Sequence, residues 1–295
     1  MSTIDRSGAG AVQLDPLPVY LDARAAFADR FLFGAGLEIG PLHQPLAVPG
    51  HVKVRYVDRM TTPELRKEYH ELADWDLVDV AVVDDGEKLA TIAAESQDFI
   101  VANHFLEHTE DPVGTIETHL GKLKPGGILF YAVPDKRFTF DYKRPLTPLD
   151  HMVADHEEGP QRSRPEHYRE WCRWVMNEEG SGSPDVAAPE EWVERRGREI
   201  DEINYSIHMH VWTQAEFLQL ILAIRERCDE GFDIEAAGRS GIEFLVVLRK
   251  QGPLPPPSPG SPPLAGPSRL DAWVGRARSL AVRARNEVRR RRARP

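Results

Sequence analysis

The segment Asp98–Pro134 constrains the fold of this 295-residue chain more than any other part of the sequence. It reads DFIVANHFLEHTEDPVGTIETHLGKLKPGGILFYAVP, with apolar runs at Phe99–Ala102 and Ile128–Val133 and a stretch of helical spacing at Val113–Leu123 between them. Short apolar runs separated by a helix are typical of parallel strands joined by a crossover helix. The segment therefore predicts one strand–helix–strand unit of an α/β sheet.

The same alternation continues on both sides of this segment, up to about residue 250. The predicted strands are Leu37–Ile39, Val52–Val57, Leu77–Val83, Phe99–Ala102, Ile128–Val133, Phe232–Ala236 and Ile242–Leu248, and the predicted helices are Pro63–Ala73, Val113–Leu123 and Thr213–Arg227. Thr213 and Glu216 have the spacing of a helix N-cap and its capping box. The pattern predicts a doubly wound, Rossmann-like, mostly parallel sheet of seven strands, whose last two strands form an antiparallel hairpin around Gly238–Gly241.

Composition limits the classes of protein to which the chain can belong. No apolar run approaches the roughly 18–20 residues needed to span a bilayer, and the N-terminus lacks the basic and apolar regions of a secretory signal. The two cysteines, Cys172 and Cys228, have neither redox nor zinc-finger spacing, which favours reduced thiols and a cytoplasmic location.

Four parts follow from composition along the chain. Residues 1–16 are expected to be a loose leader, residues 17–250 the folded body, residues 251–268 a proline-rich linker and residues 269–295 a basic amphipathic tail. The tail has ten arginines against two acidic residues, hence +8, so the rest of a chain of net charge −10 carries about −18. An acidic body predicts no specific nucleic-acid binding. The tail is predicted to be solvated or to contact an anionic membrane surface or a protein partner, which would place the protein peripherally on a membrane.

Polar residues follow each of the first four predicted strands. They are Glu38 and Gly40 at the first, Asp58 at the second, Asp84 and Asp85 at the third, and Asn103 and His104 at the fourth. Carboxyl ends of parallel strands share one edge of the sheet, where ligands bind. A carboxylate there suits ribose hydroxyls or an adenine amino group, and a glycine allows close approach of a ligand to the backbone. Asp and Gly also end strands without any ligand, but four such ends in register favour a nucleoside site.

The turn after the first strand indicates which nucleoside ligand fits. A pyrophosphate-containing dinucleotide needs G-x-G-x-x-G at this point. The sequence has Gly40-Pro41-Leu42-His43-Gln44-Pro45, with one glycine and two prolines. A nucleoside without phosphates, such as S-adenosylmethionine, tolerates this looser turn.

These motifs together resemble those of class I S-adenosylmethionine-dependent methyltransferases. The matching stretches are LEIG at 37–40, YVD at 56–58, VVDDGEKL at 82–89, ANHFLEH at 102–108, LKPGG at 123–127 and AVPD at 132–135. The resemblance covers about residues 30–250 and is closest to methyltransferase-domain proteins found with bacterial glycan-building enzymes. It implies S-adenosylmethionine as cofactor, with Glu38 and Gly40 bordering its methionine part, Asp58 on the ribose and Asp85 facing the adenine, and Asp84 is a further candidate for cofactor binding. Asn103 and His104 would line the floor near the reactive methyl.

A long insertion at residues 135–211 is rich in aromatic and basic residues and in histidine. In enzymes of this kind the segment after the fifth strand builds the acceptor site, as a helical lid. Cations at Lys136, Arg137, Lys143 and Arg144 are candidates for holding an anionic acceptor, and Trp171, Trp174 and Trp212 for stacking on a sugar or flat ring. The alternative is that the cations are solvated and the tryptophans pack in the lid.

Histidines in and beside this insertion allow three interpretations. His151 and Asp155 share a face if Pro148–His156 is helical, and His208 and His210 share one if their segment is extended. Together with His167, these four residues suit a metal site. Alternatively, His104, His208 and His210 suit an acid–base role toward a hydroxyl acceptor, and His151 and His167 would contact that acceptor. The third interpretation is lid packing.

The leading hypothesis is methyl transfer to a small-molecule or carbohydrate-linked (glycan) acceptor, at a hydroxyl group. Two other classes stay open from the sequence: a protein that binds S-adenosylmethionine without turnover, and a metal-dependent hydrolase that uses the histidine cluster.

Overall fold

The chain was analysed as a computed structural model that describes residues 18–252. Its strands are β1 (Ala35–Ile39), β2 (Lys53–Asp58), β3 (Val80–Val83), β4 (Gln97–Asn103), β5 (Leu123–Pro134), β6 (Phe232–Ser240) and β7 (Glu243–Lys250). Its α-helices are α1 (Pro18–Phe31), α2 (Thr62–Glu68), α3 (Pro112–Lys122), α4 (Leu149–Glu158), α5 (Arg164–Trp174), α6 (Asn177–Ser181), α7 (Glu190–Glu202) and α8 (Gln214–Arg227). Short 3₁₀ turns are η1 (His70–Leu72), η2 (Leu106–His108), η3 (Lys136–Phe138), η4 (Phe140–Lys143) and η5 (Pro160–Arg162).

All seven strands form one sheet in the order β3-β2-β1-β4-β5-β7-β6. The first five strands are parallel, and β7 pairs antiparallel with both β5 and β6. The predicted fold class is therefore confirmed: a doubly wound, Rossmann-like sheet with an antiparallel C-terminal hairpin. Because the chain order reverses between β1 and β4, the carboxyl ends of these two strands mark the switch point where such sheets bind ligands.

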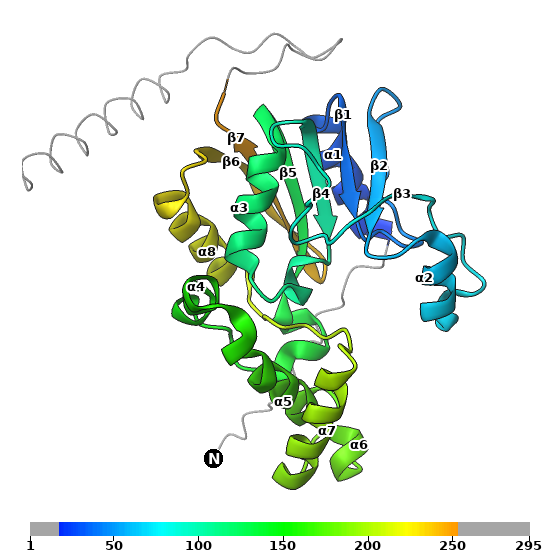
Figure 1. Cartoon of the computed structure of the whole chain (residues 1–295), viewed down its shortest axis with the longest axis vertical. Coiled ribbons are helices and arrows are strands. Elements are labelled where there is room, and N and C mark those ends of the chain that lie inside the picture. The colour runs from blue at the N-terminus through cyan, green and yellow to red at the C-terminus, as the bar shows by residue number, and fades with distance from the viewer. Residues whose placement is uncertain (1–17, 253–295) are drawn as a thin grey trace, which may run out of the picture. The chain divides into compact units, whose positions relative to one another are not determined.

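Helices cover the two faces of the sheet (Figure 1). On one face, α3 and α8 pack through Ile116, Leu120 and Phe217 on apolar side chains of the strands. On the other face, α1 packs through Ala28 and Phe31. Both faces of β4 and β5 are buried, which explains why their sequences are continuous apolar runs rather than alternating ones.

Several predicted boundaries differ from the structure, and strand β3, for example, begins at Val80 rather than at Leu77. Strand β5 already begins at Leu123, because LKPGG pairs irregularly with β4 beside Gln97 instead of forming a separate turn. Strand β6 runs through Ser240, so Gly238 lies in the strand and the hairpin turn is shorter than predicted. The predicted helix at 63–73 ends at Glu68 and is followed by η1. The predicted capping box at Thr213 and Glu216 is confirmed.

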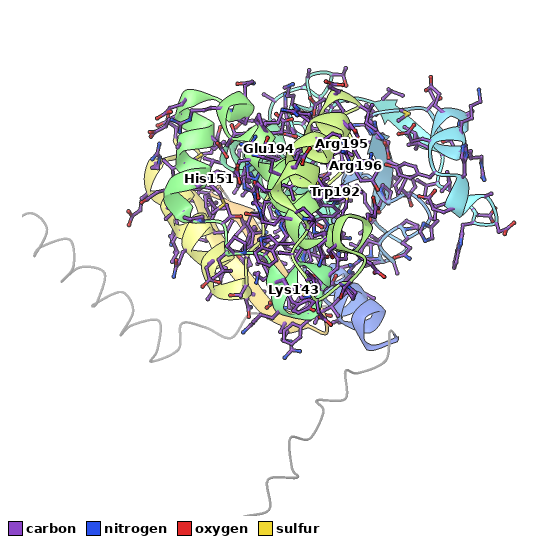
Figure 2. The ribbon with its side chains drawn as sticks, turned by 90° about the horizontal axis from the view of Figure 1, so that it is seen from below. Lys143, His151, Trp192, Glu194, Arg195 and Arg196 are labelled. Atoms are coloured by element: carbon purple, nitrogen blue, oxygen red, sulfur yellow. The ribbon has the colours of Figure 1, made fainter. Side chains whose placement is uncertain are left out.

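The insertion at 135–211 forms a helical lid that lies beyond the carboxyl ends of the strands (Figure 1). Helices α5 and α7 enclose a separate small core with Tyr168, Cys172, Val193 and Ile200. Figure 2 shows this lid from below, with His151 on α4 and Trp192 on α7. The lid therefore has its own apolar core.

Arg144 connects this core to the segment that leads into α8. Its side chain is fully buried, and its guanidinium donates to Glu170 Oε1 at 2.8 Å and to Asp141 Oδ1 at 2.9 Å. It also donates to the carbonyl of His208 at 2.8 Å. The hypothesis that Arg144 holds an anionic acceptor is wrong, because its donors are used inside the lid.

Several predictions lie outside the described residues: the leader at 1–16, the linker from residue 253 on, and the basic tail with its membrane or protein partner. Within residues 18–252, none of the helices has the length and apolar character required to cross a membrane. The cytoplasmic location stays a prediction.

The buried position of Arg144 gives a first test. Replacing it by alanine leaves the Asp141 carboxylate buried with one charged partner fewer, so Arg144→Ala should lower the free energy of unfolding by about 3–5 kcal/mol. Arg162→Ala is the matched control, because Arg162 belongs to the same insertion and its ion pair with Glu158 is exposed; it should cost less than about 1 kcal/mol. Urea unfolding of the three proteins measures both. Equal stability of the two variants would contradict this account of the lid.

Candidate functional site

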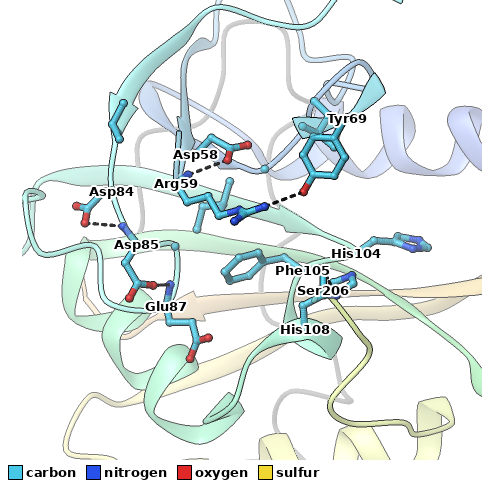
Figure 3. Close-up of a pocket in the computed structure, with 15 residues that line it drawn as sticks. Asp58, Arg59, Tyr69, Asp84, Asp85, Glu87, His104, Phe105, His108 and Ser206 are labelled. Atoms are coloured by element: carbon cyan, nitrogen blue, oxygen red, sulfur yellow. Dashed lines mark hydrogen bonds between the residues drawn. The ribbon is translucent and has the colours of Figure 1, made fainter. Parts of the chain in front are cut away.

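A cavity of about 710 Å³ opens at the carboxyl edge of the sheet, at the switch point between β1 and β4 (Figure 3). Its wall combines the ends of β1, β2 and β3 with the turn after β4 and one residue from the segment of the lid that follows α7. The lining residues are Ile39, Gly40, Leu42, Asp58, Arg59, Tyr69, Val83, Asp84, Asp85, Gly86, Glu87, His104, Phe105, His108 and Ser206. Of the seven residues predicted to bind a cofactor, five line this cavity, and Glu38 and Asn103 do not.

Gly40 turns the chain away from β1 at the cavity wall. Its φ of +61° lies in the left-handed region, which glycine adopts without strain. The space where a side chain would point is open, with no atom within 4 Å. A ligand can therefore approach the backbone here, as the sequence predicts.

Glu38, predicted to border the cofactor, does not line the cavity and instead contacts the loop after β1. Its carboxylate is buried and accepts a hydrogen bond from the backbone N–H of Leu46 at 2.8 Å. It thereby holds the loop that follows Gly40 against the end of β1. Burial raises the pKa of Glu38 to about 7, although the Leu46 N–H and Arg24 oppose the shift.

Asp58 ends β2 and faces the cavity (Figure 3). Its Oδ1 accepts from the backbone N–H of Arg59 at 2.7 Å, which fixes the carboxylate at the rim. Partial burial raises the pKa of Asp58, an effect that the neighbouring N–H groups and the Arg59 charge reduce. The Arg59 guanidinium donates a hydrogen bond to the Tyr69 hydroxyl, at 3.4 Å.

The two acids after β3, Asp84 and Asp85, make different contacts. Asp84 accepts from the Thr91 hydroxyl at 2.6 Å and from three backbone N–H groups, so it organises the loop rather than offering a free carboxylate. Asp85 points toward the cavity and accepts from the backbone N–H of Glu87 at 2.9 Å (Figure 3). Beside it, Phe105 approaches Gly86 so closely that an added Cβ there would lie 2.6 Å from its ring. A flat aromatic face next to a carboxylate suits a purine with an amino group.

His104 lies at the end of β4 with a φ of +50°, which is unusual for a residue with a side chain. Its Nε2 lies 2.6 Å from Glu243 Oε2 at the start of β7, and its Nδ1 lies 3.7 Å from Glu107. Burial disfavours the imidazolium, but the two carboxylates outweigh it and raise the pKa of His104. Asn103, predicted beside it, has both amide atoms buried without a hydrogen-bond partner and does not line the cavity.

His108 and Ser206 complete the wall on the lid side and were not predicted. His108 Nδ1 lies 2.8 Å from the carbonyl of Ile207, so this nitrogen carries the proton and Nε2 keeps its lone pair. In the sequence, His108 ends the stretch Leu106-Glu107-His108, which by itself does not indicate a site residue. This stretch forms a 3₁₀ turn, and the turn brings His108 back to the cavity.

His208 stands next to His108, with ring centroids 4.8 Å apart. Its Nδ1 lies 2.6 Å from Asp141 Oδ2, and Phe140, about half exposed, packs 4.9 Å from its ring. Glu107 is buried beside both histidines, and neither of its carboxylate oxygens has a hydrogen-bond partner. This polar group extends the cavity wall toward the lid.

Three further histidines, His151, His167 and His210, form a second group with Asp155. His210 joins His151, Asp155 and His167, whereas His208 lies with Glu107 and His108, so the two histidines predicted to act together belong to different clusters. None of the four members of this second group lines the cavity.

The predicted acceptor residues outside these groups bind within the protein. Lys136 donates to the carbonyl of Tyr142 at 3.0 Å, and Arg137 makes a bidentate pair with Asp135. Lys143 pairs with Asp185 and the carbonyl of Pro184. Trp212 is buried in the main core and Trp171 packs in the lid, as the alternative interpretation had it.

His119 supports the cavity from beneath. This fully buried imidazole lies 2.8 Å from the Gly86 carbonyl and 2.9 Å from the Tyr131 hydroxyl, and so ties the loop after β3 to α3 and β5. Burial disfavours its charged form and lowers its pKa to about 4, although the Gly86 carbonyl opposes this.

Comparison with known proteins gives a consistent result. Residues 26–203 match a family described as a methyltransferase domain. A ubiquinone biosynthesis O-methyltransferase of Saccharophagus degradans is 31% identical over 120 residues, 40% of this chain and 50% of that protein. The chain thus spans half the length of this curated relative.

Solved structures similar to the chain have low sequence identity and TM-scores below 0.5. A methyltransferase from Methanosarcina mazei, dependent on S-adenosylmethionine, has 15% identity and a TM-score of 0.40, over 76% of this chain and 96% of that one. A possible histamine N-methyltransferase from Thermotoga maritima has 14% identity and a TM-score of 0.41, over 79% and 88%. A protein from Rhodobacter sphaeroides described as a Zn-dependent alcohol dehydrogenase has 15% identity and a TM-score of 0.46, over 81% and 92%.

The lowered pKa of His119 predicts acid sensitivity. Because the pKa of His119 is about 4 in the folded state and an ordinary histidine has a pKa of 6.5, the unfolded chain binds a proton first as the pH falls. The contribution of His119 is complete above pH 6.5 and is lost between there and pH 4, by roughly 3 kcal/mol in total. We expect urea unfolding of His119→Gln to show a shallower loss of stability from pH 7 to pH 4.5 than that of the unsubstituted protein. Parallel pH profiles of the two proteins would contradict this role.

Proposed function

We propose that the chain, which belongs to the methyltransferase domain family, transfers the methyl group of S-adenosylmethionine to a hydroxyl oxygen of a small acceptor. The observation that carries the proposal is the neutral imidazole of His108 at the wall of the cavity, next to the carboxylates at the strand ends. Family membership favours transfer over the two other classes that the sequence left open, binding without turnover and metal-dependent hydrolysis.

The cavity residues suit a nucleoside cofactor without phosphates. Asp58 is placed to accept from ribose hydroxyls and Asp85 from an adenine amino group, with the Phe105 ring packed on the purine. Gly40 leaves open space for the rest of the cofactor, and one arginine, Arg59, is the sole guanidinium in the wall. S-adenosylmethionine supplies an electrophilic methyl group on a sulfonium.

Transfer of that methyl to a hydroxyl requires the acceptor oxygen to lose its proton. Burial, together with the neighbouring His208, lowers the pKa of His108, although Glu107 acts in the opposite direction. His108 is therefore neutral at pH 7. With Nδ1–H donated to the Ile207 carbonyl, Nε2 is the nitrogen that accepts the acceptor's proton.

His208 and Asp141 act on this step as positioning residues. Asp141 orients His208, whose ring packs edge-on against His108 and limits how His108 can turn. The exposed ring of Phe140 continues this surface outward and offers a flat apolar face for an aromatic or sugar ring. This surface supports a small hydroxylated or carbohydrate-linked acceptor. The name of the curated relative, an O-methyltransferase, also supports oxygen as the acceptor atom.

The proposal is tested by labelled methyl transfer from S-adenosylmethionine to the small-molecule fraction of a cell extract, with the linkage of the product read by NMR. We expect an oxygen-linked methyl group. With that acceptor, His108→Gln should lower kcat by roughly 10²–10⁴-fold and remove the rise of kcat with pH near the pKa of the histidine, while S-adenosylhomocysteine still binds.

His70→Gln serves as the control, because His70 lies exposed on η1 outside the cavity. It should retain the kcat of the unsubstituted enzyme. A nitrogen-linked or carbon-linked product, or an unchanged pH profile in His108→Gln, would contradict the proposal.

A further inference from the structure

Four ligand-type side chains from three separate segments meet inside the lid. His151 and Asp155 come from α4, His167 from α5, and His210 from the segment that leads into α8. Figure 2 marks His151 on its helix. The proposed methyl transfer uses none of these residues, so their convergence needs its own explanation.

The distances between their ligand atoms match one coordination sphere. Nε2 of His151 lies 3.1 Å from Nε2 of His167 and 3.1 Å from Oδ2 of Asp155, and Nε2 of His167 lies 3.8 Å from the same oxygen. The ligand atoms of all four residues lie within 4.8 Å of one another. Tetrahedral Zn²⁺ with bonds of about 2.0–2.1 Å separates its ligands by about 3.3–3.4 Å. The three distances of 3.1, 3.1 and 3.8 Å lie on both sides of this ligand–ligand separation.

The hydrogen bonds within the group, such as that between His151 and His167, leave two of its buried atoms without a partner. Asp155 Oδ2 and His210 Nδ1 are buried and have no hydrogen-bond partner, although the residues are only 2% and 0% exposed. Each unsatisfied buried polar atom costs about 1–3 kcal/mol. A cation between them would satisfy both atoms at once, whereas packing alone leaves both without a partner.

The outer contacts are those that metal ligands usually have. Asp155 Oδ1, the oxygen turned away from the group, accepts from the Ser163 hydroxyl at 2.6 Å. His210 Nε2, the nitrogen opposite the unpartnered one, lies 3.4 Å from the Glu110 carbonyl. Such contacts orient ligands and fix the histidine tautomer.

We propose that His151, Asp155, His167 and His210 bind one Zn²⁺ ion. Three imidazoles and one carboxylate suit zinc among the common metals. Four protein ligands close the coordination sphere, so the ion is structural rather than catalytic. Of the five metal candidates drawn from the sequence, these four form the group, and His208 belongs to the group at the cavity.

The ion links the lid to the cavity wall. The segment that carries His210 also carries Ser206, which lines the cavity, and His208, which packs on His108. Fixing His210 to α4 and α5 therefore fixes the acceptor side of the cavity. The carboxylates at the ends of β2 and β3 lie on other elements, so cofactor binding does not depend on the ion.

The test is metal analysis of the full chain, purified from zinc-supplemented culture with any affinity tag removed. We expect one zinc per chain, and after chelation we expect titration with Co²⁺ to give the visible absorption of a tetrahedral site. His151→Ala should weaken zinc binding by more than roughly 100-fold, because loss of a direct ligand exceeds the 10–100-fold effect of an outer contact. Ser163→Ala should fall within that smaller range.

The control is His156→Ala on the same helix, since His156 pairs with Asp111 outside the group; it should keep one zinc per chain. The side chain of His151 is 33% exposed, so its removal leaves no enclosed void and the variant should fold. Binding of S-adenosylhomocysteine to the chelated protein verifies that the sheet is intact and distinguishes metal loss from loss of the fold.

Two results would overturn the proposal. One is the absence of stoichiometric zinc together with no tetrahedral cobalt spectrum in a protein that binds S-adenosylhomocysteine. The other is zinc bound equally by the unsubstituted protein, His151→Ala and Asp155→Asn.

Discussion

The contact of His104 with Glu243 connects the main parts of the structure. Glu243 starts β7 and is buried, so its carboxylate needs charged partners; it receives them from His104 after β4 and from Arg24 on α1. Burial alone would raise the pKa of Glu243, but Arg24 and His104 lower it, which keeps it ionised. The Glu243 carboxylate thus connects β4 of the parallel part of the sheet, the hairpin of β6 and β7, and helix α1. His104, its partner after β4, lines the cavity.

The fold was predictable from the sequence because buried strands require apolar residues, which are visible as apolar runs. Strands buried on both faces, such as β4 and β5, read as continuous apolar runs, and the spacing between them leaves room for one helix. The cavity was predictable to the extent that it depends on strand ends: Gly40, Asp58 and Asp85 follow their strands directly, and register alone brings them together.

The parts that could not be predicted depend on backbone turns and on side-chain direction. His208 and His210 are two residues apart, but their rings enter different clusters because the segment follows the lid surface instead of a regular strand. His108 reaches the cavity through a 3₁₀ turn, and Glu38 turns to the Leu46 N–H instead of a ligand. Arg144 looked like a surface cation, yet it is the centre of a buried ion-pair group, which no local pattern distinguishes. Sequence periodicity gives the element and its buried face, whereas these contacts depend on which loop meets which helix.

The central claim is that the strand-end carboxylates hold S-adenosylmethionine, and calorimetric titration with S-adenosylhomocysteine tests it most directly. The account predicts one binding site per chain and, for Asp58→Ala, a loss of affinity of about 10–100-fold, the equivalent of one hydrogen bond to a charged group. Asp79→Ala, an exposed acid just before β3, should bind like the unsubstituted protein. Absence of binding to the unsubstituted protein, or equal affinity of Asp58→Ala, would contradict the account.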